Sequence, residues 1–470
     1  MKKSTLVYFT LFLFPYLAWA QSQYVLPEGL VKSGALTAMA NDWEAIGINP
    51  ANLGWDNNDR ISFSLINFGV GLQSGGLSTH DIKTILNKND TNQPAAAKEM
   101  LASGHGPSLF ADMNWFAFSI KIDKIGTFAI NLCDKAVGNF TLSPSGASLI
   151  TQKGHIGDSV ALHKLIGTSL ALYQYREFNL AFGRQLCEIG GHSEDDYYES
   201  YNVRYSGYMG DKVDTEPKIS VSDSNAIKIY GGIGFKYIWG ESYFNGDVDA
   251  YGINAEYAVP DNFPAFSPLA TTNPGHGLAA DLGLSATYKK WTFGISATDL
   301  GSITWHQSAF TIADTTIFGL NSIQKTINKL DSNKVADFKK NTNVTMMLPT
   351  KLRLGAAYQL SRQVAFSSDL IFPLNAATGN LAGPYFALGT QVGIWKVLIL
   401  NAGIATTTYY GTSVPFGISL CAGHAVQMYF GTTDVLTYFG KTTNGNVSAA
   451  YGMIRVNIRG KKIGWREKLN

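Results

Sequence analysis

Charged residues are scarce in this sequence of 470 residues, since Asp, Glu, Lys and Arg make up only 15% of it, against about 25% in a typical globular protein. Aromatic residues reach 12%, and the chain holds 48 glycines. Disordered chains are rich in charge and poor in aromatic residues, so this composition excludes a disordered protein. The apolar fraction of 45% is ordinary. What is unusual about the apolar residues must therefore be their distribution along the chain and not their number.

Cysteine is also rare, and no catalytic set of residues is evident. Cys133, Cys187 and Cys421 are widely spaced and odd in number, which excludes a disulfide framework and the usual zinc-site spacings. Ser159 and His163 lie close together in the sequence, but no third group is placed to orient the histidine. We therefore expect no enzyme, no bound metal and no cofactor.

Long apolar runs are missing after residue 20, which excludes a transmembrane helix in the rest of the chain. The first twenty residues begin with Lys2 and Lys3, continue with an apolar run and end in a small-x-small pattern at Ala20. They predict a secretory signal peptide that is cleaved near Ala20. Its removal takes two lysines from the 37 basic residues and leaves 35 against 35 acidic ones. Zero net charge argues against a nucleic-acid partner.

Alternation with a period of two is the clearest pattern in the chain. In residues 278–289, every second residue from Leu278 to Tyr288 is apolar, and most of those between them are polar or small. The pattern recurs at 351–360, 364–372 and 454–459. A run of about 9–11 residues that alternates in this way is typical of a β-strand that crosses a membrane.

Twelve further segments are candidates for such strands. They are roughly 60–72, 109–122, 125–135, 168–175, 178–187, 227–238, 246–257, 291–300, 383–394, 397–406, 414–423 and 425–434. With the four clear cases the count is 16, or 14 if one weak pair fails. The expected fold is therefore an all-β protein, a transmembrane antiparallel barrel of 14–16 strands over residues 60–459.

The gaps between these segments alternate in length. Short turns are expected at 123–124, 176–177, 289–290, 361–363, 395–396 and 423–424, and long gaps at 73–108, 136–167, 188–226, 258–276, 301–349 and 435–446. Outer-membrane barrels have short periplasmic turns and long extracellular loops. A secreted β-sandwich or propeller remains the alternative, but it does not predict this sorting. Helical patterns at 80–102, 145–166 and 319–340 predict extracellular loop helices, which either cover the barrel mouth or only stabilise the loops.

Charged residues occupy the face of the strands that is opposite to the apolar one. The residues predicted to face the lumen are Lys236, Glu256, Asp281, Lys289, Lys351, Arg353, Asp369, Arg455 and Arg459. Both signs of charge occur, whereas an open ion-selective pore is expected to show one dominant sign. This mixture favours a plugged lumen.

Residues 21–59 precede the first strand and do not alternate. Asp42 is placed to cap a short helical turn, Asn49-Pro50 predicts a second turn, and Gly54 is suited to end it. Such a compact segment predicts a hatch inside the lumen, although an ordered periplasmic lead-in fits as well. The residues expected to form the hatch or ligand path are Asp42, Trp43, Glu44, Asn49, Pro50, Asn52 and Leu53.

An Asp followed by Asn49-Pro50-Ala51-Asn52-Leu53 just before the first strand resembles the N-terminal hatch of the FadL/TodX-like outer-membrane transporters. The whole chain also looks like an uncharacterised family of Bacteroidota outer-membrane proteins. This second likeness lies in Gly126-Thr127-Phe128, Lys236-Tyr237 before Trp239-Gly240, and Pro415-Phe416-Gly417.

The resemblance implies an outer-membrane barrel with an internal hatch and passive uptake or capture of a hydrophobic or amphipathic small molecule. The alternative is a structural or type IX secretion-linked partner protein, because other members of the superfamily serve that system. Outer-membrane lipid, a hydrophobic ligand, and a secretion-system or periplasmic protein are the expected partners. The basic tail at 460–470 is either a periplasmic contact or a solubilising end.

Overall fold

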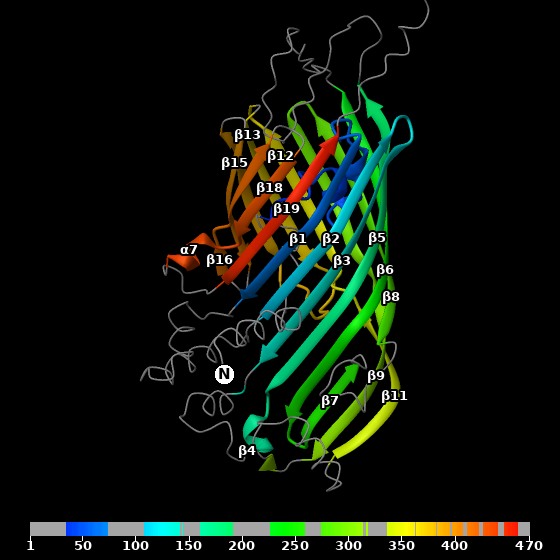
Figure 1. Ribbon diagram of the computed structural model, residues 1–470, viewed down its shortest axis with the longest axis vertical. Coiled ribbons are helices and arrows are strands. Elements are labelled where there is room, and N and C mark those ends of the chain that lie inside the picture. Colours follow the sequence, from blue (N-terminus) through cyan, green and yellow to red (C-terminus); the bar gives the residue numbers. More distant parts are fainter. Residues whose placement is uncertain are drawn as a thin grey trace, which may run out of the picture.

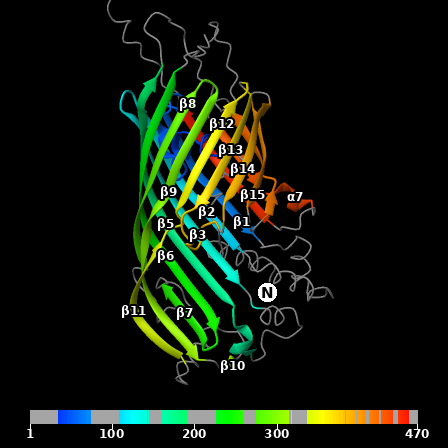
Figure 2. The same cartoon turned by 180° about the vertical axis from the view of Figure 1, so that it is seen from behind.

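The chain forms one closed barrel of antiparallel strands in the computed structural model (Figures 1 and 2). The structure describes residues 34–73, 108–141, 143, 160–190, 226–258, 274–313, 316–317, 336–361, 363–381, 383–394, 397–407, 411–422, 426–439 and 446–458. The predicted signal peptide and the basic tail lie outside these residues. Among the residues that the structure describes, no helix combines the length and the apolar character needed to cross a membrane.

Fourteen strands close the barrel. In their order around the wall they are β1 (Ile61–Gln73), β2 (Ser108–Ile122), β3 (Gly126–Thr141), β5 (Ser169–Ile189), β6 (Ile227–Asp249), β8 (Gly275–Tyr288), β9 (Trp291–Ala313), β12 (Lys351–Gln359), β13 (Val364–Pro373), β14 (Tyr385–Ile394), β15 (Leu398–Thr407), β17 (Phe416–Ala422), β18 (Val426–Thr432) and β19 (Asn446–Ile458). β19 pairs with β1 from Ile61↔Ile458 to Gln73↔Asn446, which closes the wall. The expected all-β antiparallel barrel is confirmed, with 14 strands.

One side of the barrel is much taller than the other. β5, β6 and β9 have 21, 23 and 23 residues, whereas β12 to β15 have 9 or 10. β7 (Gly252–Ala258) and β11 (Ala336–Met347) pair with the far ends of the long strands and extend this tall wall (Figure 1). The remaining elements are short: β4 (Val160–Ala161), β10 (Thr316–Ile317), β16 (Gly411–Ser413), the 3-10 turns η2 (Asp42–Ala45), η3 (Pro50–Gly54) and η4 (Leu162–Leu165), and α7 (Val435–Tyr438).

The barrel is apolar outside and polar inside, the reverse of a water-soluble protein. On β6, Phe235 and Trp239 are 49% and 58% exposed, whereas Lys236 between them is 1% exposed. The same alternation exposes Leu282 on β8 and buries its neighbour Asp281. Since the side chains of a strand alternate between its two faces, one face of the wall is apolar and the other carries the charges.

Two of the predicted strands are one. The segments 168–175 and 178–187 were expected to flank a turn, but β5 runs unbroken from Ser169 to Ile189. It pairs along its length with β3 on one side and β6 on the other. The predicted turn at 176–177 is therefore wrong, and this accounts for one of the two strands by which the count of 16 exceeds 14.

Both residues at the predicted turn are charged, and each forms an ion pair on a different face of β5. Arg176 forms an ion pair with Asp134, at 2.5 Å between Nε and Oδ1. Glu177 turns inward, is 1% exposed, and lies 3.0 Å from Nζ of Lys135. Adjacent charges often mark a loop in a soluble protein, but a wall with a polar interior can accommodate both within a strand.

The second excess strand is a hairpin. Residues 246–257 were expected to cross the barrel, but they comprise the end of β6, a turn and β7. The carboxylate of Asp249 accepts hydrogen bonds from the backbone N–H of Tyr251 and of Gly252, at 2.7 and 3.0 Å. Gly252 has a φ of 134°, which a residue with a side chain rarely adopts. The turn is therefore specified locally.

Because β5 is one strand, the long connection between β5 and β6 lies at the other end of the barrel from the one that was expected. β5 ends at Ile189 opposite Ile227 at the start of β6. Gly183, near that end of β5, is opposite Thr127, which follows the short turn between β2 and β3. The connection 190–226 therefore leaves and re-enters the wall at the short-turn end. The expectation that the gap 188–226 lies with the extracellular loops is wrong.

The predicted loop helices fall mostly on residues that are not described. Segment 80–102 lies wholly outside the described residues, as does most of 319–340, but 336–340 belong to β11 rather than to a helix. At the end of the segment 145–166, residues 160–161 form β4 and 162–165 form η4. The helical prediction is therefore wrong for 336–340.

The two neighbouring charges of β5 give a test of its continuity. Replacing Glu177 with Ala leaves Lys135 buried without its counterion, which is expected to cost about 3–5 kcal/mol of unfolding free energy. Replacing Arg176, whose side chain is 41% exposed, is expected to cost about 1 kcal/mol or less. Urea unfolding of the detergent-solubilised protein measures both. Equal, small effects would indicate that both residues lie in an exposed turn.

Candidate functional site: the N-terminal segment in the lumen

Residues 34–59 lie inside the barrel, toward the end that carries the short turns (Figure 1). Most of them are buried, and Trp43, Ala45, Asn49, Asn52 and Leu53 are each at most 1% exposed. We call residues 34–59 the luminal segment. It contains η2 and η3 and contacts β1, β2, β3, β5, β6 and β8. Leu53 packs in a small apolar cluster with Ala45 and Ile46 of the segment and with Ala129 and Ala181 of the wall.

Asparagine side chains hold the luminal segment in its shape. Asn49 precedes η3, and its Oδ1 accepts a hydrogen bond from the backbone N–H of Ala51, while Pro50 occupies the first position of the turn. The Nδ2 group of Asn52 donates to the carbonyls of Thr37 and Ala40, at 3.0 and 2.8 Å. Short amide side chains thus satisfy backbone groups that a short 3-10 turn leaves unpaired.

Asn58 completes this network. Its Nδ2 donates to the carbonyls of Asn52 and Leu53, both at 2.8 Å, and so closes the end of η3. Its Oδ1 accepts from the backbone N–H of Asp42 at 3.4 Å. The segment is therefore tied to itself over a span of 16 residues, which lets a chain without strands or long helices keep one conformation inside the lumen.

Arg455 of β19 joins the luminal segment to the strand pair that closes the barrel. Its NH2 group lies 2.9 Å from Oδ2 of Asp42, and its NH1 group forms a second ion pair with Glu44. Its Nε donates to Oδ1 of Asn457 at 3.2 Å, which also accepts from the hydroxyl of Ser62 on β1. All of these residues are buried. A buried guanidinium with two carboxylates is stable only while every partner stays in place.

Asp369 of β13 holds the other side of the segment. Its Oδ2 accepts hydrogen bonds from the backbone N–H of Leu36 and of Thr37 and from the Thr37 hydroxyl, at 2.9, 3.0 and 2.7 Å. A further bond comes from β9, two strands along the wall from β13, where the Ser296 hydroxyl donates to the carbonyl of Ile48 at 2.5 Å. The segment is therefore bonded to this part of the wall as well as to Arg455 on β19.

Glycines line the wall where the luminal segment touches it. Gly183 of β5, Gly232 of β6 and Gly283 of β8 are directly paired across neighbouring strands. A Cβ added to Gly232 would lie 2.2 Å from the carbonyl carbon of Pro50, and one added to Gly183 would lie 2.3 Å from the Pro50 oxygen. Any side chain at these positions would overlap the backbone of η3.

The same device continues on the next strands. Gly294 of β9 pairs with Gly355 of β12, and added Cβ atoms would lie 2.7 Å from the Thr37 carbonyl oxygen and 2.6 Å from the Thr37 Cβ, respectively. At Gly283 an added Cβ would lie 2.0 Å from Oδ1 of Asn49. We call these five residues the glycine cradle. It explains part of the high glycine content of the sequence.

A cluster of buried charges lies against the luminal segment. Nζ of Lys236 lies 2.5 Å from Asp299 and 3.1 Å from Asp281. Oδ1 of Asp281 also accepts from the backbone N–H of Asp299 at 2.8 Å, where the strand has a φ of 60°. Lys135 and Glu177 form a second ion pair. Opposite charges held in pairs can remain ionised inside the barrel.

Six of the residues that were expected to face the lumen are buried in the structure. Lys236, Asp281, Lys351, Arg353, Asp369 and Arg455 are all at most 5% exposed. Glu256 lies on β7 and accepts a hydrogen bond from the Tyr243 hydroxyl at 3.0 Å. Lys289 lies in the exposed turn between β8 and β9, and Arg459 is outside the described residues. Within the described part of the chain, no group of three His, Cys, Asp or Glu residues is placed to hold a metal ion.

Three residues of the charged cluster were not predicted from the sequence, namely Lys135, Glu177 and Asp299. Lys135 was the last residue of the expected strand at 125–135, whereas β3 continues to Thr141, so Lys135 was not assigned to the lumen. Glu177 was assigned to a turn. Asp299 lies at a positive φ, next to an irregular pairing of β8 with β9. An alternation that starts again after such an irregularity could have revealed Asp299, but its partners could not be deduced from one sequence.

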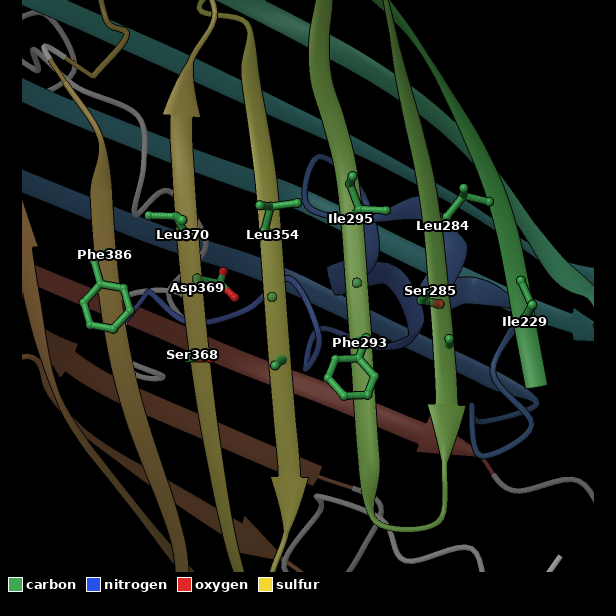
Figure 3. Close-up of a pocket in the computed structure, with 14 residues that line it drawn as sticks. Ile229, Leu284, Ser285, Phe293, Ile295, Leu354, Ser368, Asp369, Leu370 and Phe386 are labelled. Carbon is green, nitrogen blue, oxygen red and sulfur yellow. The ribbon is translucent and has the colours of Figure 1, made fainter. Parts of the chain in front are cut away.

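A groove lies on the outer face of the wall, over Gly294 and Gly355 of the cradle (Figure 3). Its volume is about 480 Å³, and its sides are apolar residues such as Leu284, Phe293, Leu354 and Phe386. Figure 3 shows the luminal segment behind these strands, with Asp369 pointing toward it. Only the backbone of Gly294 and Gly355 separates the outer surface from the segment here, because neither glycine has a side chain.

Comparison with known proteins does not assign a function to the chain. Residues 224–433 match a family of unknown function (DUF5723), and no curated protein matches the sequence. The toluene transporter TodX of Pseudomonas putida is similar at 10% identity, with a TM-score of 0.46 and coverage of 93% of this chain and 96% of that chain. Identities this low do not carry a function from one protein to another.

Two further solved structures are similar to a comparable degree. The CymD monoaromatic hydrocarbon channel is 11% identical, with a TM-score of 0.42 and coverage of 93% of this chain and 98% of that one. A FadL homologue of Pseudomonas aeruginosa is 10% identical, with a TM-score of 0.40 and coverage of 93% and 97%. The function therefore has to be argued from the residues of this chain.

The glycine cradle gives the first test of the site. Gly232→Val is expected to displace the luminal segment, because a side chain there overlaps Pro50, and to speed amide hydrogen exchange in residues 34–59 by at least about tenfold. The matched control is Gly393→Val on β14, where an added Cβ has no neighbour nearer than 3.7 Å. Unchanged exchange in the Gly232 variant would show that the cradle does not hold the segment.

Arg455 gives the second test. Arg455→Met leaves Asp42 and Glu44 buried without their counterion, at an expected cost of about 3–5 kcal/mol, so exchange in η2 should accelerate strongly. Adding Asp42→Asn and Glu44→Gln removes the uncompensated charges and should restore most of the protection. If the triple variant exchanges as fast as the single one, the ion pairs are not what holds η2.

Proposed function

We propose that this protein is an outer-membrane β-barrel whose lumen is closed by the luminal segment, and that it takes up or captures a hydrophobic or amphipathic small molecule. The membrane location is supported by the outward apolar face. On β6 this face runs from Ile227 to Trp239, and about 12 residues at about 3.3 Å each, tilted by about 40°, rise about 30 Å. That height matches the hydrocarbon core of a bilayer.

Polar groups begin directly beyond this apolar face. Trp115 on β2 is 41% exposed, and its indole N–H donates to Asp134 at 2.8 Å. Asp134 and Glu241 in turn form ion pairs with Arg176. Tryptophan beside charged residues is typical of the interface between hydrocarbon and water. Together with the predicted signal peptide, this supports export to the outer membrane of a Gram-negative cell, after cleavage near Ala20.

The observation that carries the proposed ligand class is an aromatic cluster on the inner face of the tall wall. Its buried members are Tyr173, Tyr175, Ile238, Tyr243, Ala258, Ala279, Ile303, Trp305 and Leu348. The rings of Tyr243 and Trp305 stack, with centroids 5.2 Å apart. The cluster lies between the charged cluster and the far end of the long strands, because Trp305 is paired with Gly275, four residues beyond Ala279, the partner of Lys236.

The chemistry of this cluster suits a largely apolar ligand with a polar group. Aromatic faces bind hydrocarbon well, and they align a ligand without covalent chemistry. The indole N–H of Trp305 has no hydrogen-bond partner among the described residues, although the side chain is fully buried. A ligand that carries one acceptor would satisfy it. The luminal segment beyond the charged cluster would then act as the hatch that controls passage, with Asp42 to Leu53 as its core.

Trp305→Ala tests this proposal, and Trp239→Ala is its matched control. Both residues lie at the same level of the tall wall, but Trp239 is exposed on the outer face. Removing an aromatic group from a ligand contact is expected to cost about 1–3 kcal/mol, so binding should weaken by about tenfold or more. Binding of radiolabelled oleate and of toluene to the full-length protein in lipid nanodiscs measures the effect, with accumulation in proteoliposomes as a second readout.

Two results would contradict the proposal. If neither compound binds above the level of empty nanodiscs, the aromatic cluster is not a hydrophobic ligand site of this kind. If Trp305→Ala and Trp239→Ala weaken binding equally, the labelled compound associates with the outer surface of the barrel and not with the aromatic cluster. Either result would favour a structural or secretion-linked partner protein.

A further inference from the structure

The groove on the outer face is built from side chains at successive levels of four neighbouring strands, β8, β9, β12 and β13. At the level farther from the short turns the side chains are large and apolar, and Figure 3 shows them side by side. They are Leu284, Ile295, Leu354 and Leu370, each paired with the next across the sheet. This row forms one rim of the groove.

Smaller side chains form the floor at the next level. Ala356 of β12 is paired with Ser368 on one side and with Phe293 on the other, and Phe293 is paired with Ala286. The wall is indented here because three of these four side chains are small. The groove has a volume of about 480 Å³. A methylene group is similar in size to a water molecule, which takes up about 30 Å³ in the liquid, so the groove has room for a stretch of one acyl chain.

Aromatic rings form the level nearest to the short turns. Tyr288, Trp291, Tyr358 and Phe366 are paired in series across the same four strands. The ring of Trp291 lies 4.6 Å from that of Tyr358 and stacks on Phe293 at 5.8 Å, measured between centroids. Tryptophan and tyrosine prefer the level between the hydrocarbon and the headgroups. The groove therefore lies on the hydrocarbon side of an interfacial aromatic row.

Two lysines lie directly beyond this aromatic row. Lys289 and Lys290 form the turn between β8 and β9, and both are exposed. Nζ of Lys289 lies 5.3 Å from the centroid of the Tyr288 ring, and Nζ of Lys290 donates to the carbonyl of Leu360 at 3.1 Å. Among the described residues, neither lysine forms an ion pair with a carboxylate. Since an ammonium group has three donors, both lysines keep donors for a ligand.

The order of these levels matches the order of the parts of a phospholipid. From the turn inward, the wall presents positive charge, then aromatic rings, then an apolar groove. Lys290 and Phe293 are three residues apart, or about 10 Å along an extended strand. A headgroup at the lysines thus places the start of an acyl chain at the groove.

We propose that the groove binds one phospholipid of net negative charge from the periplasmic leaflet, with its phosphate at Lys289 and Lys290 and one acyl chain along Ala356 and Ser368. The short-turn end of an outer-membrane barrel faces the periplasm. The site goes beyond the proposed uptake and rests only on the proposed membrane location of the barrel.

The headgroup charge is what selects the lipid. The groove and the surrounding hydrocarbon are both apolar, so the transfer of an acyl chain between them has no hydrophobic driving force, and packing alone holds the chain. Lysines at a membrane surface attract anionic headgroups. A choline headgroup instead places a cation beside Lys289 and Lys290, which opposes its binding.

Native mass spectrometry of the full-length protein measures this selection. The protein is released from nanodiscs that contain equal amounts of phosphatidylglycerol and phosphatidylcholine, and the retained lipid is identified by its mass. We expect one phosphatidylglycerol per protein, retained in preference to phosphatidylcholine by about tenfold or more, since each lysine near an anionic headgroup contributes about a factor of five.

Lysine variants test the headgroup contact. The double variant Lys289→Gln, Lys290→Gln should retain the two lipids equally. The matched control is Lys124→Gln, because Lys124 is exposed in the turn between β2 and β3 at the same end of the barrel. Its φ of 67° is close to the 53° of Lys289. The control should keep the full preference for phosphatidylglycerol.

A groove variant tests the acyl-chain contact. Ala356→Leu fills the floor and is expected to reduce the retained phosphatidylglycerol by about fivefold, because the chain loses its packing contacts there. Ala402→Leu adds the same atoms at an exposed position of β15 and should bind lipid as the native protein does. Both substitutions lie on the outer face, so neither disturbs the luminal segment.

Three results would overturn the proposal. Equal retention of the two lipids by the native protein, or an equal loss in the Lys124 control, would indicate an ordinary lipid annulus. A lipid-free dimer that Ala356→Leu dissociates would show that a second copy of the chain occupies the groove. Failure of oleate and toluene to bind would overturn the proposed uptake but would leave the lipid preference unaffected.

Discussion

The wall of this barrel has to be free of side chains where the luminal segment rests against it. Five inward-facing glycines on neighbouring strands provide that surface, and the backbone of η3 and of residue 37 fills the space that their side chains would take. Close approach of two backbones also brings polar groups together, so that Asn49 donates to the carbonyl of Leu284 and Trp55 to the hydroxyl of Ser285. The position of the segment in the lumen follows from this contact.

The charged residues of the interior depend on the same contact. Arg455 needs Asp42 and Glu44 of the segment, and Asp369 needs the N–H groups of Leu36 and Thr37. A polar interior without the segment would leave these groups with water alone. The mixed signs of charge in the lumen are therefore partners of one another and of the segment. The ligand site that we propose lies at the tall wall, where aromatic residues replace the charges.

Local patterns in the sequence predicted the fold well, because each strand alternates within itself. The burial of Lys236 or Arg353 follows from that alternation alone, and Asn49-Pro50 specifies a turn wherever it lies. Arg176 and Glu177 show the limit of this reasoning, because two adjacent charges indicate a turn only if the protein interior is apolar.

Contacts between residues that are far apart in the sequence could not be predicted. The pairing of Gly183 with Gly232, and of Gly232 with Gly283, depends on the register of strands that are separated by long connections. A shift by one residue would turn each glycine outward. A single sequence shows which residues are present in the cradle and in the charged cluster, but it does not show which of them lie close together in the fold.

The central claim is that residues 34–59 close the lumen of the intact protein. Conductance of the full-length protein in a planar lipid bilayer tests it most directly, with a variant that lacks residues 34–54 as the open reference. The account predicts no steady conductance for the full-length protein and a large steady conductance for the deletion variant. A full-length protein that conducts as steadily as the deletion variant would contradict it.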